Sequence, residues 1–85
     1  MIASNSIKKA LKTIDLEIEL HNSGSNNRIG DKSVLEAIKV ELLKMQTAMS
    51  TKQFYPSYDY ILRDSYEYDR ICGTLLDAYF MYEKL

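Results

Sequence analysis

The stretch SYDYILRDSYEYDRICGTLLDAYFMYEK, residues 57–84, decides the fold of this 85-residue chain. Its apolar and tyrosine side chains recur every three or four residues, which places them on one face of a helix. The stripe consists of Tyr58, Ile61, Ser65, Tyr68, Cys72, Leu75, Tyr79 and Tyr82. It holds four of the chain's seven tyrosines, which can bury a ring while the hydroxyl keeps a hydrogen-bond partner. The spacing predicts one long C-terminal helix over about residues 57–84, with Ser57 as its N-cap.

Two further segments have the same period and predict two shorter helices. The first is expected over about residues 6–21, with a main stripe of Ile7, Leu11, Ile14 and Ile18. The second is expected over about residues 33–50, with a stripe of Leu35, Ile38, Leu42, Met45 and Met49. Ser33 and Glu36 have the spacing of a capping box, and Asp31 is the competing N-cap.

Together these segments predict one all-α domain over residues 1–85, a small antiparallel three-helix bundle with a long C-terminal helix. The connection 22–32 is long for a bundle and is expected to be flexible. It is interpreted as a linker, with a binding loop as the alternative. The C-terminal helix would outrun its partners by about two turns. Its aromatic end would then be exposed, unless Ile29 folds back over it.

Two details of the C-terminal segment carry their own expectations. Opposite charges follow one another along its back and predict a solvent-exposed ladder of Asp59, Arg63, Glu67 and Arg70. Gly73 interrupts a strong helical pattern, at a cost of roughly 1 kcal/mol relative to alanine. A close crossing with another helix would explain this glycine, and so would chance.

The composition argues against most enzyme and cofactor classes. The formal net charge is −1, with mixed signs, so nucleic acid is an unfavourable partner. One cysteine and one histidine provide neither a disulfide nor a zinc cluster, and no other cofactor is indicated. No sequence motif pairs His21 with a nucleophile or an acid, so no catalytic residue is expected. No apolar run approaches the roughly 18 residues of a membrane span, and a cytoplasmic location is expected.

Several side chains are predicted to form contact surfaces. The candidate interface residues are Leu16, Leu20, Tyr60, Tyr66, Tyr79, Phe80 and Tyr82. Val40 and Leu43 also lie away from the main stripe of their helix. The basic residues Lys8, Lys9 and Lys12 lie at the start of the first helix, whereas its acidic residues come later. This order is unfavourable for the helix dipole. The order is interpreted as neutral variation of exposed charges, which cost little stability. A docking patch for an acidic partner is the alternative.

These observations favour a non-enzymatic protein-binding module, such as an inhibitor, immunity factor, antitoxin, adaptor or assembly subunit. The surplus of apolar and tyrosine surface is the main reason. The alternative is an oligomeric small-ligand or nucleotide-binding protein with its site between subunits. A homodimer is expected, through the Leu16/Leu20 face or through residues 79–85, because a two-fold pair uses the same patch twice.

Overall fold

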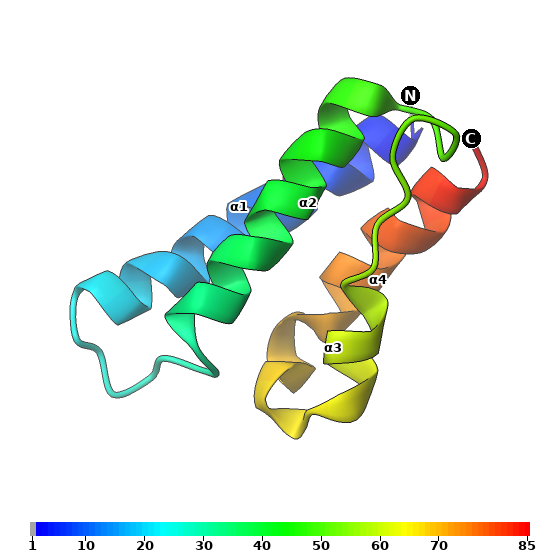
Figure 1. The fold of residues 1–85 in the computed structure, drawn as a ribbon. Coiled ribbons are helices and arrows are strands. Elements are labelled where there is room, and N and C mark those ends of the chain that lie inside the picture. The colour runs from blue at the N-terminus through cyan, green and yellow to red at the C-terminus, as the bar shows by residue number, and fades with distance from the viewer. Residues whose placement is uncertain (1) are drawn as a thin grey trace.

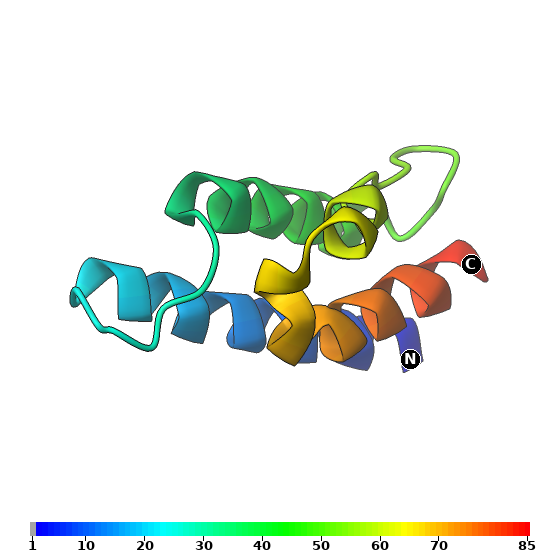
Figure 2. The same cartoon turned by 90° about the horizontal axis from the view of Figure 1, so that it is seen from below.

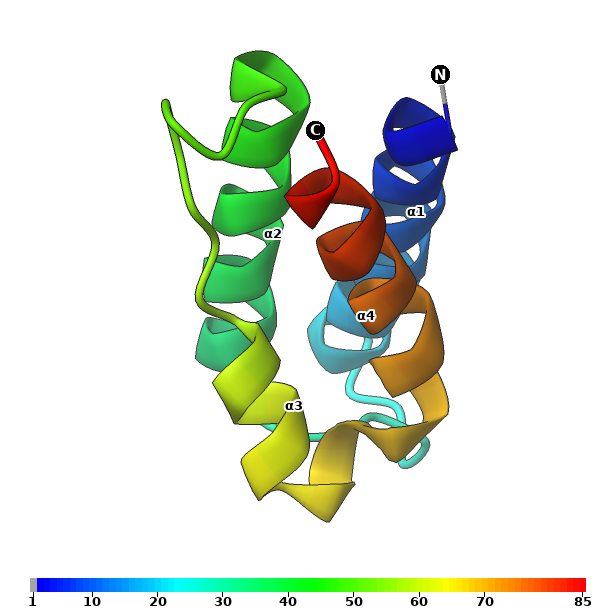
Figure 3. The ribbon, with the colours of Figure 1, turned by 90° about the vertical axis from the view of Figure 1, so that its right-hand side faces the viewer.

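The computed structural model describes residues 2–85, with side chains from Ala3 onwards, and it confirms the all-α class (Figure 1). The elements are α1 (Ile2–Asn22), α2 (Lys32–Ala48), α3 (Asp59–Asp64), the 3-10 helix η1 (Tyr66–Tyr68) and α4 (Asp69–Glu83). No strand occurs in this range. α1 contacts both α2 and α4 and runs antiparallel to each of them (Figures 2 and 3).

The predicted stripes supply the core. Those of the first two helices bury their central members completely, and α4 contributes Leu75 and Ala78. Leu11 and Ile18 are half-buried and pack against the same cluster. The fully buried residues of α1 and α2 are Ile7, Ala10, Ile14, Leu35, Ile38, Leu42 and Met45.

The prediction of one continuous helix over 57–84 is wrong. Ser65 adopts an extended conformation, with φ −138° and ψ 130°, and separates α3 from η1 and α4. Its hydroxyl accepts a hydrogen bond from the Glu67 N–H at 3.2 Å. Serine readily makes such local bonds, which compete with a helical backbone. The chain reverses at this point, so α3 and α4 lie beside one another (Figure 3). The predicted overshoot therefore does not arise.

The helix ends also differ from the expectation. α1 begins at Ile2 rather than near residue 6. α2 begins at Lys32, which leaves Ser33 inside the helix. Asp31 is the N-cap residue, although its side chain makes no cap hydrogen bond. α2 ends at Ala48, and its C-cap residue is Met49, whose φ of 49° is left-handed and whose N–H donates to the Met45 carbonyl at 2.9 Å.

α3 is capped from another helix rather than by its own serine. Glu41 of α2 accepts hydrogen bonds from the Ser57 N–H at 2.7 Å, the Ser57 hydroxyl at 3.0 Å and the Tyr58 N–H at 3.0 Å. The helix itself begins at Asp59. A carboxylate at this end satisfies backbone donors that have no intrahelical partner. Glu41 thereby fixes the start of α3 on α2.

The charge ladder forms only in part. Asp59 and Arg63 make an ion pair at 3.7 Å, as expected. Arg70 instead crosses to α1, where its Nε and Nη2 donate to the Glu17 carboxylate at 3.1 and 2.6 Å. Arg70 Nη2 also donates to the Asn27 carbonyl at 2.6 Å. The bond to Glu17 raises the pKa of Arg70. Glu17 is only 7% exposed, whereas the Arg70 side chain is 45% exposed, so the pair links α1 to α4 at the edge of the core.

The connection 22–32 contacts the η1 end of the bundle. His21 Nε2 donates to the Ile29 carbonyl at 2.6 Å, and Ile29 packs against the core. The Tyr68 hydroxyl accepts a hydrogen bond from the Asp31 N–H at 3.2 Å. Ile29 is therefore at the opposite end of the bundle from residues 79–85, and the predicted cover over that end is wrong (Figure 1).

Gly30 and Gly24 provide a matched pair for testing this connection. Both have positive φ, +57° and +71°, so alanine is strained at either position. A Cβ at Gly30 would also collide with the Tyr68 ring, whereas a Cβ at Gly24 meets nothing within 4 Å. We expect Gly24→Ala to cost about 1–2 kcal/mol, and Gly30→Ala a further ~1–3 kcal/mol from overpacking. Urea unfolding of both variants checks this, and equal losses would contradict the placement of Tyr68.

Gly73 lies on α4 with open space around it, so a close helix crossing does not explain this glycine. Gly73→Ala should therefore raise the free energy of unfolding by about 1 kcal/mol. The melting temperature would then rise by roughly 4–8 °C. Ala37, exposed on α2, is the reciprocal control, because Ala37→Gly should lower stability by a similar amount. A Gly73→Ala variant that is less stable than wild type would contradict the placement of Gly73 in open space on α4.

Candidate functional site

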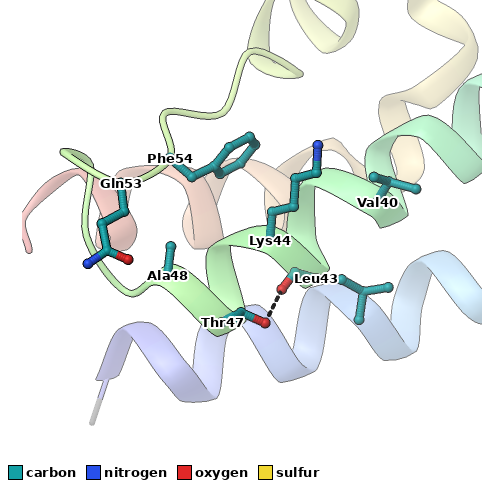
Figure 4. A pocket seen from close by; sticks show the side chains of 7 residues that line it. All are labelled: Val40, Leu43, Lys44, Thr47, Ala48, Gln53 and Phe54. Atoms are coloured by element: carbon teal, nitrogen blue, oxygen red, sulfur yellow. Dashed lines mark hydrogen bonds between the residues drawn. The ribbon is translucent and has the colours of Figure 1, made fainter.

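The outer face of α2 carries an open, mainly apolar groove of about 600 Å³ (Figure 4). Val40 and Leu43 are 50% and 43% exposed, which is high for side chains of this type. The segment after α2 forms the other wall. The lining residues are Val40, Leu43, Lys44, Thr47, Ala48, Gln53 and Phe54.

The position of this groove follows from how α2 ends. Val40, Leu43 and Thr47 are spaced by three and four residues on the side away from the buried stripe. After α2, the Phe54 N–H donates to the Ser50 carbonyl at 3.1 Å and closes a turn. This turn returns Phe54 alongside α2, where it packs partly against the core.

The groove has one charged group among its lining side chains, the ammonium of Lys44. It lies 5.6 Å from the centroid of the Phe54 ring, a cation–π distance. The nearby carboxylate of Glu41 is already occupied by Ser57 and Tyr58. The lining is therefore mainly apolar, with a single positive charge.

A second, smaller depression of about 340 Å³ lies on α1. It is lined by Leu16, Glu19, Leu20 and Ser23. Leu16 is 57% exposed and Leu20 is half-buried, so Leu16 is the more accessible of the two predicted interface leucines. The predicted docking residues Lys8, Lys9 and Lys12 are exposed on the same helix. A docking role for them stays a prediction.

The aromatic candidates divide into surface and core residues. Tyr60, Tyr66 and Phe80 are exposed, and Tyr66 reaches 92%. They come from α3, η1 and α4, and none of them lines either depression. Their exposure agrees with the prediction, but they do not gather around the groove.

Tyr79 and Tyr82 are buried, so their assignment to an interface is wrong. The Tyr82 hydroxyl lies 2.7 Å from the Ser50 carbonyl and 2.8 Å from that of Phe54, and accepts from the Ser50 N–H at 3.2 Å. The Tyr79 ring packs edge-on against Tyr58 at 5.5 Å, and burial raises the pKa of Tyr79. The segment 49–58 covers this end of α4, a fold-back that no periodic pattern signals.

Other reactive groups are held in structural contacts. His21 is bonded to the Ile29 carbonyl, and Cys72 is half-buried against the core. Across residues 2–85, no group of three or more His, Cys, Asp or Glu residues is arranged to hold a metal ion. In the same range, no helix combines the length and the apolar character needed to cross a membrane.

The sequence pattern indicated the α2 wall of the groove but not the wall formed by the segment after α2. Val40 and Leu43 were identified because they lie off the main stripe of α2. Phe54 was missed because it lies in an irregular segment that has no period. Comparison with known proteins identifies no relative, since no family model, curated protein or solved structure matches the chain.

Tyr82 and Tyr60 should respond differently to loss of the hydroxyl. Tyr82→Phe leaves backbone groups of Ser50 and Phe54 without a buried partner, so we expect a loss of about 1–3 kcal/mol. Tyr60→Phe, at an exposed position, should change stability by less than about 0.5 kcal/mol. Thermal or urea unfolding measures both. A neutral Tyr82→Phe would mean that its hydroxyl does not hold the 49–58 segment.

Proposed function

We propose that this protein is a non-enzymatic protein-binding module that takes up an amphipathic helix of another protein in the α2 groove. The observation that carries the proposal is the exposure of Val40 and Leu43 beside Phe54. Contiguous exposed apolar surface is characteristic of interaction sites. The proposed classes of inhibitor, immunity factor, antitoxin, adaptor and assembly subunit all require such a contact.

The shape of the groove supports a helical ligand. Its α2 wall extends from Val40 to Ala48, about 12 Å along the helix axis. Two turns of a bound helix match this length, with apolar side chains at positions i, i+3, i+4 and i+7. Several apolar residues on one face of the ligand would then contact Leu43 and Phe54 together.

The charge of the lining supports an acidic residue on that ligand. Lys44 is the single charged side chain, and no carboxylate lines the groove. An aspartate or glutamate at the edge of the ligand's apolar face would meet Lys44 without an opposing acid. Such a contact adds specificity and a faster association rate more than raw affinity.

The alternative is a small-ligand or nucleotide-binding protein, and the groove volume of about 600 Å³ favours it, because small-molecule sites span roughly 300–1,000 Å³. Small-molecule sites also direct a few polar groups towards one point. The polar side chains that line the groove are Lys44, Thr47 and Gln53. Thr47 donates its hydroxyl to the Leu43 carbonyl at 3.1 Å. A helical protein ligand therefore fits the lining better.

Two lysines on α2 provide a matched test of the proposed function. Lys44 lines the groove, whereas Lys32 is exposed at the start of the helix. We expect Leu43→Glu and Lys44→Glu each to weaken partner binding at least about tenfold, equivalent to ~1.4 kcal/mol. Lys32→Glu should leave binding unchanged. The measurement is affinity capture with each variant as bait, followed by titration of the captured protein.

A photo-crosslinking residue at position 47 identifies what occupies the groove. The expected crosslinked peptide is an amphipathic helix that carries an acidic residue. A partner that binds Leu43→Glu as tightly as wild type would overturn the proposal. Stabilisation by a metabolite, with no crosslinked protein, would support the small-ligand alternative instead.

A further inference from the structure

We propose that α1 pairs with α1 of a second copy of this chain, antiparallel and about a two-fold axis. The contact uses the outer face of α1, which we define as Lys9, Lys12, Leu16, Glu19, Leu20 and Ser23. These residues are exposed, apart from the half-buried Leu20, which lines the depression on α1. The face is separate from the α2 groove, so the inference does not rest on the proposed function.

The outer face is a single stripe. From Lys9 to Leu16 its members follow one another by three or four residues, and Glu19 and Leu20 lie three and four residues after Leu16. They therefore share one side of a helix with about 3.6 residues per turn. That side is opposite to the buried stripe of Ile7, Ala10 and Ile14. α1 forms an edge of the bundle, with α2 and α4 both on its inner side (Figures 2 and 3). A second helix can therefore lie along it.

Within one copy, the charges on α1 are in an unfavourable order. Lys8, Lys9 and Lys12 lie in the N-terminal half, and the first turn holds no acidic residue. The N-terminal end of a helix favours negative charge and its C-terminal end favours positive charge. Two of the later acids are already used, since Asp15 pairs with Lys39 at 2.6 Å and Glu17 with Arg70.

Glu19 and Lys12 are the charges that a second copy would pair. Neither forms an ion pair within residues 2–85. They lie seven residues apart on one flank of the outer face. In an antiparallel pair of identical helices, the same flank of each helix faces its equivalent. An axis passing beside Asp15 and Leu16 then places Lys12 opposite Glu19 of the second copy, and the reverse.

The same register places the remaining features of the face. Leu16 of both copies meets at the axis, and Leu20 flanks it. Lys9 comes opposite Asn22 of the second copy, the last residue of α1, where the helix carbonyls and the negative end of the dipole lie. Lysines that are misplaced on their own helix are thus well placed for the neighbouring one.

This self-complementarity selects a second copy over a foreign partner. A two-fold interface must match itself, with residue i opposite j and j opposite i. The outer face contains both signs of charge on one flank, and the midpoint between Lys12 and Glu19 falls beside Leu16, which is 57% exposed. The alternative end-to-end dimer through residues 79–85 is disfavoured, because Tyr79 and Tyr82 are buried. The contact covers about 20 Å of helix, which is a small interface of the kind found in weak complexes, so association is expected to depend on protein concentration.

Charge reversal provides the decisive experiment. Sedimentation equilibrium from about 1 µM to about 1 mM should show the wild-type mass rising from 9.9 kDa towards twice that value. Lys12→Glu and Glu19→Lys should each weaken association at least about tenfold. The double variant K12E/E19K should recover wild-type affinity to within about threefold, because the same pair is restored with its signs exchanged.

Two controls make the result specific. Lys52→Glu reverses an exposed lysine outside α1 and should leave association unchanged, whereas Leu16→Glu should abolish it. Circular dichroism confirms that each variant is folded. A wild-type mass of 9.9 kDa at every concentration would overturn the proposal. So would single variants that associate like wild type, or a double variant that stays as weak as the singles.

Discussion

The fold depends on tyrosine side chains whose rings are buried and whose hydroxyls bond to backbone groups. The Tyr58 hydroxyl donates to the Leu75 carbonyl at 2.6 Å, and burial raises its pKa. Tyr82 holds the turn after α2, and Tyr68 holds the start of α2. The Tyr82 and Tyr68 bonds join an aromatic core contact to an irregular segment, and the Tyr58 bond joins the start of α3 to a carbonyl within α4. These tyrosines therefore hold the irregular segments and the short helix α3 against the core.

A second class of contact joins elements that are distant in sequence through one charged side chain. Glu41 holds the start of α3 on α2, and Arg70 joins α1, α4 and the loop carbonyl of Asn27. Charge-assisted bonds of this kind are stronger and more directional than ordinary surface pairs. They fix the relative positions of the helices, because apolar stripes alone would allow one helix to shift along another.

The spacing of apolar residues predicted which faces of the regular helices are buried. The buried faces of α1 and α2 were identified from spacing, and Leu75 was correctly placed in the core. Ser65 shows the limit of that reasoning. The three–four spacing continues through it because Tyr68 still enters the core, while the backbone departs from the helix. The spacing of side chains therefore did not determine the path of the chain.

The contact surfaces were less predictable for a related reason. Leu16, Val40 and Leu43 were visible as apolar residues off their stripes, and they are exposed. Tyr79 and Tyr82 were misassigned because their burial depends on the non-periodic segment 49–58. Phe54 and the bonds of Glu41 and Arg70 depend on tertiary placement, for which a single sequence carries no local signal.

The placement of Tyr82 also affects how the groove would respond to a ligand. Its hydroxyl anchors the carbonyl of Phe54 from inside the protein, so one wall of the groove is fixed by the core. A wall that is already ordered loses little conformational entropy when a ligand arrives, and the contact energy is retained as affinity. The groove is in this sense preorganised. Its outer surface is therefore coupled to a residue that a ligand never touches.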